Sequence, residues 1–115
     1  MPLETLLMER FKVKTRAVEN PQAVTSLGTT AQIILANNPN RLAWVIVNLS
    51  ANVIYIGFTR TVSATTGAEQ GVRLDANGGS AVMIWDEDFQ PTSWAIWGIA
   101  SAINSQLYSY EVVEI

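Results

Sequence analysis

The run Asp86-Glu87-Asp88 is the densest group of potentially reactive side chains in this sequence. In an extended segment, Asp86 and Asp88 would point to the same side, as a carboxylate pair or a calcium site requires. The Asp-x-Asp-x-Asp spacing and the glycine of an EF-hand loop are missing. A solvated acidic loop fits the same three residues, so a cation site stays one of two interpretations.

Histidine and cysteine are absent from the sequence. Their absence removes Ser–His triads, thiolate nucleophiles and disulfides, and it deprives zinc of both preferred ligand types. Asn77-Gly78-Gly79 is not a phosphate cradle, because it leads into a predicted strand rather than a helix. The residue types therefore predict a protein that is not an enzyme and needs no cofactor.

Basic side chains alternate near the N-terminus. They are Arg10, Lys12, Lys14 and Arg16. In a strand over residues 10–17 they would share one face, with Phe11 on the other. Residues 1–16 carry +4 and −2, hence +2, while the rest carry +3 and −8, hence −5. This basic strip suits contact with an acidic partner surface, or it protects an exposed sheet edge; nucleic acid is not expected, because the net charge is −3.

Large apolar side chains supply candidates for a subunit interface. Trp94 and Trp97 differ in parity on a predicted strand, so one of them is exposed or at an interface, unless both are buried between two sheets. Leu3, Leu6 and Leu7 share a face at helical spacing, which predicts a short helix over residues 2–9. The candidate interface residues are Leu3, Leu6, Leu7, Phe11, Trp94 and Trp97.

These side chains must be positioned by strands, because the dominant hydrophobic period is two and turn signals recur every 8 to 12 residues. The pattern predicts an all-β fold: a single-domain β-sandwich or jelly roll of about eight strands over residues 17–115, preceded by an arm over residues 1–16. The predicted strands are 10–17, 32–36, 42–47, 53–58, 72–74, 80–85, 94–100 and 106–115. We expect two hairpins, 42–47 with 53–58 and 72–74 with 80–85.

The composition also bears on partners. The 115 residues are 49% hydrophobic and only 15% charged, whereas about 25% is usual for charged residues in soluble domains. A surface covered by a partner explains this, and so does a polar but uncharged surface. No apolar run approaches the ~20 residues that span a bilayer. The acidic Glu4 and Glu9 flank the N-terminal apolar patch, so we expect no secretory signal.

Three segments carry a family resemblance: RLAWVIVNLSANVIYIGF, GVRLDANGGSAVMIW and IWGIASAINSQLYSYEVVEI. An apolar strand ending in Asn-x-Ser precedes "IYIG", a loop, a short strand, a Gly-Gly turn and another apolar strand. This order resembles that of small structural proteins of tailed double-stranded DNA viruses, including capsid decoration and cement proteins. The similarity covers roughly two-thirds of the chain and rests on strand and turn residues.

The resemblance implies a protein of the virion, made in the host cytoplasm and bound as a homotrimer to the outside of the major capsid protein lattice, which it stabilises. Under it, the four basic residues would contact the capsid. Related patterns also occur in head fibres and tail components. The alternative function is therefore a carbohydrate- or receptor-binding module, with Trp94 or Trp97 as a stacking platform.

Overall fold

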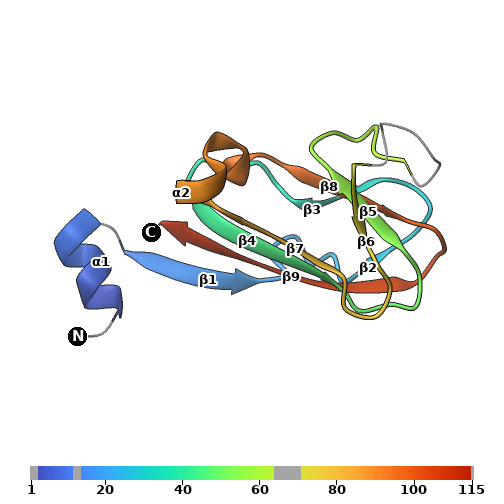
Figure 1. Cartoon of the computed structure of the whole chain (residues 1–115), viewed down its shortest axis with the longest axis horizontal. Coiled ribbons are helices and arrows are strands. Elements are labelled where there is room, and N and C mark those ends of the chain that lie inside the picture. The colour runs from blue at the N-terminus through green and yellow to red at the C-terminus, as the bar shows by residue number, and fades with distance from the viewer. Residues whose placement is uncertain (1–2, 12–13, 64–70, 115) are drawn as a thin grey trace.

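Two antiparallel sheets pack face to face in the computed structural model, which describes residues 3–11, 14–63 and 71–114 (Figure 1). Sheet I has the strand order β1 (Thr15–Glu19), β9 (Ser105–Glu114), β4 (Arg41–Asn48) and β7 (Ser80–Ile84), with β2 (Ser26–Leu27) paired to β9. Sheet II has the order β3 (Gln32–Leu35), β8 (Ile96–Ala100), β5 (Ile54–Gly57) and β6 (Val72–Leu74). The predicted all-β sandwich is confirmed.

Alternation along the long strands produces the core. In β4, Trp44, Ile46 and Asn48 are buried while the residues between them are only half-buried. β9 alternates in the same way over ten residues. The inward side chains of both sheets form one cluster: Leu27, Ile34, Leu35, Trp44, Ile46, Ile54, Ile56, Leu74, Ile96, Ala100 and Leu107. Successive side chains of a strand point to opposite faces, so a strand buried on one side shows a hydrophobic period of two. This period, in segments rich in β-branched and aromatic residues, is what predicted the strands.

Most connections cross from one sheet to the other, which is the winding of a jelly roll. The two predicted hairpins are therefore wrong. β4 pairs with β7 and β9, whereas β5 pairs with β6 and β8. Likewise β6 lies in sheet II and β7 in sheet I. The turn residues were recognised correctly, but a turn signal does not tell whether the chain returns beside the same strand or crosses to the facing sheet.

The side chain of Asn48 explains why the chain crosses there. Asn48 is fully buried, and its Nδ2 donates to the carbonyl oxygens of Asn52 (2.7 Å), Leu74 (3.0 Å) and Asp75 (3.2 Å). Its Oδ1 accepts from the backbone N–H (2.9 Å) and the hydroxyl (2.7 Å) of Ser50. One amide thus binds both crossing segments, residues 49–53 and 75–79, together; we call this end of the sandwich the arch end.

Two positions in the second crossing segment depend on special backbone geometry. Asn77 and Gly78 both have positive φ, 61° and 118°. A Cβ atom at Gly79 would collide with the backbone of Asp75. The cluster Asp75-Ala76-Asn77-Gly78-Gly79 is thus a turn, as predicted, and its backbone reaches the other segment through Asn77 N–H, which donates to the Ser50 carbonyl at 2.8 Å.

The N-terminal segment differs from the prediction. Helix α1 (Leu3–Phe11) runs two residues beyond the expected helix, and β1 starts only at Thr15. Arg10 and Phe11 therefore end a helix, so the predicted strand over residues 10–17 is wrong in its first half, and the basic residues do not form one strand face. Figure 1 shows α1 beyond the end of β1, apart from the sandwich, and the molecule measures 47 × 23 × 20 Å.

The segment after β7 also departs from the predicted loop and strand. Residues Trp85–Asp88 form the short helix α2, and Gln90–Ser93 form the 3₁₀ turn η2. β8 begins at Ile96 rather than at Trp94. Phe89, between α2 and η2, has a positive φ of 61°. α2 and η2 together lie over one end of the sheets, opposite the arch end (Figure 1).

Candidate interaction surfaces

The acidic run does not form the extended carboxylate pair that its spacing allowed. It lies in α2, where the Asp88 carboxylate accepts the Ile84 backbone N–H at 2.8 Å. Within residues 3–11, 14–63 and 71–114, no group of three or more carboxylate, histidine or cysteine side chains could hold a metal ion. Asp88 thus fixes the end of β7, while Asp86 and Glu87 are exposed to solvent.

The buried ion pair of Arg41 and Glu111 is structural. Arg41 Nε donates to Glu111 Oε2 at 2.6 Å, and their side chains are 1% and 9% exposed. The same guanidinium donates to the carbonyl oxygens of Trp94 (3.0 Å), Thr92 (3.5 Å) and Ala36. Its donors are used to join β4 and β9 to the segment around η2, which leaves the pair no access to a substrate. No local sequence pattern predicts this pair, because its partners are 70 residues apart.

The predicted N-terminal contact residues fall into separate parts of the structure. Leu3 and Leu6 of α1 are 69% and 39% exposed. Lys14, before β1, and Arg16, within it, are both exposed. Lys12 lies outside the described residues, as do the side chains of Leu7, Arg10 and Phe11. Among the described residues, the N-terminus therefore presents a helix with two exposed leucines, followed by two accessible cations, and their roles stay predictions.

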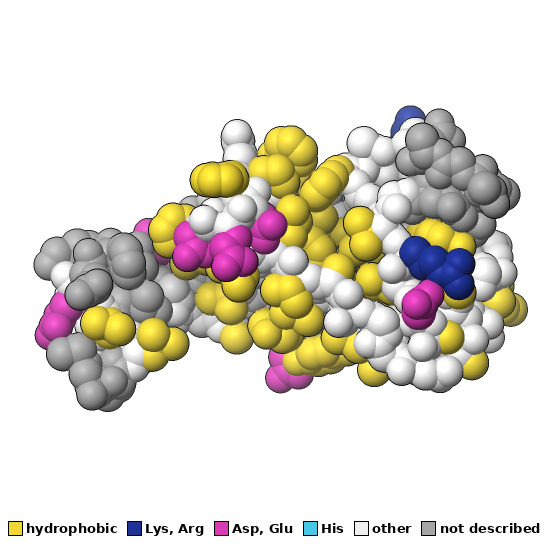
Figure 2. Space-filling model, viewed as in Figure 1, with side chains coloured by type: hydrophobic (Ala, Val, Ile, Leu, Met, Phe, Trp, Pro, Cys, Tyr) yellow, Lys and Arg dark blue, Asp and Glu magenta, His cyan; other side chains and the backbone are white. Residues whose placement is uncertain are grey.

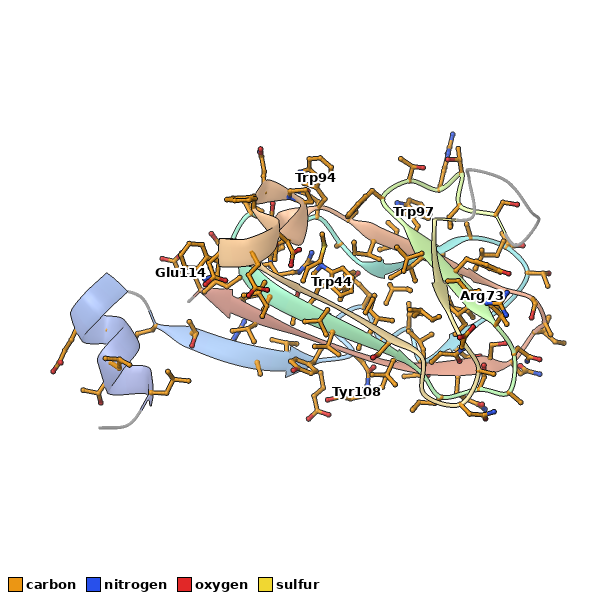
Figure 3. All side chains as sticks on the ribbon, in the orientation of Figure 1. Trp44, Arg73, Trp94, Trp97, Tyr108 and Glu114 are labelled. Carbon is orange, nitrogen blue, oxygen red and sulfur yellow. The ribbon has the colours of Figure 1, made fainter. Side chains whose placement is uncertain are left out.

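The two tryptophans also separate. Trp94 follows η2 and is 42% exposed, with its ring edge-on to Phe58 at a centroid distance of 5.4 Å. Trp97 of β8 is half-buried and packs beside Tyr55, Val62 and Ile99. Figure 3 shows the two side chains on different parts of the molecule. Of the two, Trp94 fits the prediction of an exposed tryptophan, and Trp97 belongs to a small cluster on the outer face of sheet II.

A pocket of about 360 Å³ opens between strands β6 and β7, where the two sheets present free edges. Its floor includes Trp44, which is only 2% exposed. Its rim includes Phe58, Val72 and Val82, which are 42%, 53% and 53% exposed. We call this feature the edge groove. Figure 2 shows hydrophobic side chains along this side of the molecule.

The charges beside the edge groove are unevenly distributed. Asp86, Glu87 and Asp88 of α2 border one end, and Asp88 itself lines the pocket. Arg73 lies on β6 toward the other end and is paired with Asp75 at 2.8 Å (Figures 2 and 3). An elongated occupant would therefore meet a negatively charged end and an end whose cation is already paired.

The floor of the edge groove holds an unsatisfied donor. Trp44 Nε1 is buried and has no hydrogen-bond partner in the described structure. Buried polar groups in native proteins are nearly always paired, so an exception of this kind is a candidate contact for something else. Nothing in the sequence distinguished Trp44 from the other three tryptophans.

The outer face of sheet I is a second apolar surface. The strand register places Ala43 beside Ile84 and Val112, and Val45 beside Val82 and Tyr110. β1 continues these rows with Ala17 and Glu19. On sheet II, by contrast, Val62 of the segment after β5 covers part of the outer face. Apart from Glu19 at its edge, sheet I thus presents a largely apolar four-strand face to solvent.

One tyrosine on this outer face has a shifted pKa. The Tyr108 hydroxyl donates to Glu19 Oε2 at 2.9 Å. This hydrogen bond, more than any other cause, raises the pKa of Tyr108, because it stabilises the protonated phenol. The contact joins β9 to the end of β1 and carries no chemistry of its own.

No family model, curated protein or solved structure matches this chain. None of the described helices is long and apolar enough to cross a membrane. The function is therefore argued from the geometry of these surfaces.

Proposed function

We propose that this chain is a non-enzymatic structural subunit that binds the outside of a viral capsid lattice and stabilises it. The observation that carries the proposal is the outer face of sheet I. Four strands place small and aromatic side chains there in register, with Val45 near the centre. Such a face is suited to a broad, shallow contact with another protein surface.

Two exposed cations lie at the β1 edge of sheet I, beside that face. Arg16 is in β1 opposite the buried Val113, so its side chain leaves the strand on the side away from Ala17 and Glu19, and Lys14 directly precedes the strand. Cations at the rim of an apolar contact set orientation and association rate more than affinity. We assign capsid registration to Lys14 and Arg16, and not to Arg10, which belongs to α1.

Binding to a lattice does not require a strong single contact. An oligomer that engages several capsid sites at once multiplies its effective affinity without any new interaction. The mechanism is burial of the sheet I face at each site, at roughly 25 cal/mol per Å² of apolar surface before the costs of association. A lattice that carries many such subunits should therefore dissociate at a higher temperature than the bare lattice.

The test is co-sedimentation with capsids assembled from the major capsid protein encoded by the same genome. The unaltered chain should pellet with these capsids and raise their melting temperature. Val45→Glu, at the centre of the face, should abolish both effects while the variant stays folded by circular dichroism. Leu49→Glu is the matched control, because Leu49 is 57% exposed at the arch end. The proposal is contradicted if the unaltered chain does not bind the capsids, or if V45E binds them as well as the unaltered chain does.

A receptor-binding function is the second candidate, and the exposed ring of Trp94 is the observation that favours it. Tryptophan faces of this kind stack on sugars, and Phe58 holds the ring edge-on. A glycan array with the folded chain tests it. Binding that is lost in Trp94→Ala supports this function, and an array without signal rejects it.

A further inference from the structure

We propose that the edge groove receives helix α1 of a second copy of this chain. The inference concerns assembly between copies and goes beyond capsid binding, since it uses the β6–β7 side of the sandwich. It follows from unmatched features of one molecule: a helix that stands apart with two exposed leucines, and an apolar groove whose floor contains an unpaired donor.

The exposed leucines of the helix and the lining of the groove are alike in chemistry, and the groove has room for the side chains rather than for the whole helix. Nine residues of α-helix are about 14 Å long at 1.5 Å per residue. The groove offers about 360 Å³ of space lined mainly by apolar residues of β5, β6 and β7. Leu3 and Leu6, one helical turn apart and both exposed, provide side chains that can enter it. Helix-in-groove docking of this kind is read from anchors at i and i+3 or i+4.

The tether makes a second copy the better donor of the helix. Between Phe11 and Thr15 the chain can span at most about 14 Å, since each residue extends about 3.5 Å. β1 and β7 are opposite edges of sheet I, three strand spacings or about 14 Å apart, and the groove lies beyond β7. Because α1 stands beyond the end of β1, it would have to fold back across the whole width of sheet I to reach its own groove, whereas the helix of a neighbour has no such restriction.

The proposed contact is heterologous, because it joins different surfaces of the two partners. In a heterologous contact, a variant that has lost the groove and a variant that has lost the helix can still bind each other. A contact between identical surfaces would not be restored in this way. Two variants each remove one half of the contact: Val72→Glu places a charge on the groove rim, and Leu3→Glu with Leu6→Glu places charges on the helix. Since all three residues are exposed, the fold should tolerate each change. Ile103→Glu is the matched control, on a residue 68% exposed in the segment between β8 and β9.

Sedimentation equilibrium of the full-length chain measures the result. The unaltered chain and I103E should exceed the monomer mass of 12.6 kDa. V72E alone and the L3E/L6E variant alone should be monomers, with association weakened at least about tenfold. Mixed together, they should form a one-to-one complex, because the first retains its helix and the second retains its groove.

The outcomes decide between the occupants. A monomeric unaltered chain across a wide dilution series overturns the proposal, as does association that survives in V72E. A mixture that stays monomeric also overturns it, since helix–helix or groove–groove contacts predict that result. The indole N–H resonance of Trp44 gives a second readout and should shift in the mixture. Capsids are absent from this experiment, so its failure is distinguishable from a failure of capsid binding.

Discussion

The arch end and the β6–β7 side of this sandwich treat polar and apolar groups in opposite ways. At the arch end, Asn48 is completely buried and the structure gives bonds to both of its side-chain polar atoms. On the β6–β7 side, Phe58, Val72 and Val82 are exposed and Trp44 Nε1 has no partner. The chain thus satisfies its own polar groups at the arch end, whereas it leaves a donor unpaired and apolar side chains exposed on the side where we propose that a partner binds.

Replacing Asn48 should have the largest effect, because the arch end depends on one amide. Asn48→Ala removes five side-chain hydrogen bonds and leaves the carbonyls of Leu74, Asp75 and Asn52 without that donor. We expect a loss of about 3–5 kcal/mol in the free energy of unfolding, measured by urea denaturation.

The exposed Asn40 supplies the control for that measurement. Asn40→Ala, which removes an amide at a surface turn, should cost well under about 1 kcal/mol. Equal losses for both variants would show that Asn48 does not hold the crossing segments together.

The Arg41–Glu111 pair should come next. Arg41→Met leaves a buried carboxylate and several carbonyls without their donor, so it should destabilise the protein by about 3 kcal/mol. Adding Glu111→Leu to Arg41→Met should restore part of this loss, because no uncompensated charge remains in the core. A double variant less stable than R41M alone would argue against this explanation.

A charge on the groove rim should leave stability almost unchanged. Val72 is 53% exposed, so Val72→Glu should alter the free energy of unfolding of the monomer by no more than about 0.5 kcal/mol. The denaturation midpoint is compared at a concentration where the unaltered chain is also monomeric. A large loss in V72E would mean that the β6–β7 side helps to hold the fold, and the contrast with the arch end would disappear.

The smallest effect concerns Tyr108. Its hydrogen bond to Glu19 raises the pKa of the phenol in the folded state. The bond therefore contributes stability below the ordinary tyrosine pKa of about 10, and this contribution is lost as pH rises through the higher folded value. Glu19→Gln should return the pKa of Tyr108 toward its ordinary value in an ultraviolet phenolate titration. An unchanged titration would remove Glu19 as the main cause.

The sequence predicted the strands better than their partners. Period two identified β4, β5, β7 and β9, and Asp75-Ala76-Asn77-Gly78-Gly79 was recognised as a turn. The crossing at Asn48 was missed, because a buried asparagine and a solvent-exposed turn asparagine look the same in sequence. Arg10 was misassigned since alternating Arg and Lys fit a strand, whereas the apolar residues before them continue a helix through Phe11.

The candidate surfaces were predictable only in part. Spacing predicted a short N-terminal helix with leucines on one face, and parity left an exposed tryptophan as one of two interpretations. The edge groove was not, because its lining comes from five strands and α2, whose neighbours are known only once the winding is known. The unpaired Nε1 of Trp44 likewise depends on three-dimensional packing, and no local pattern marks it.

Amide hydrogen exchange at two protein concentrations tests the central contrast most directly. The account predicts slow exchange at the arch end, residues 48–50 and 77–79, that does not depend on concentration. It predicts added protection in α1 and in residues 80–89 at the higher concentration, where the helix of one copy occupies the groove of another. Exchange that is the same at both concentrations throughout the chain, or protection that increases first at the arch end, would contradict it.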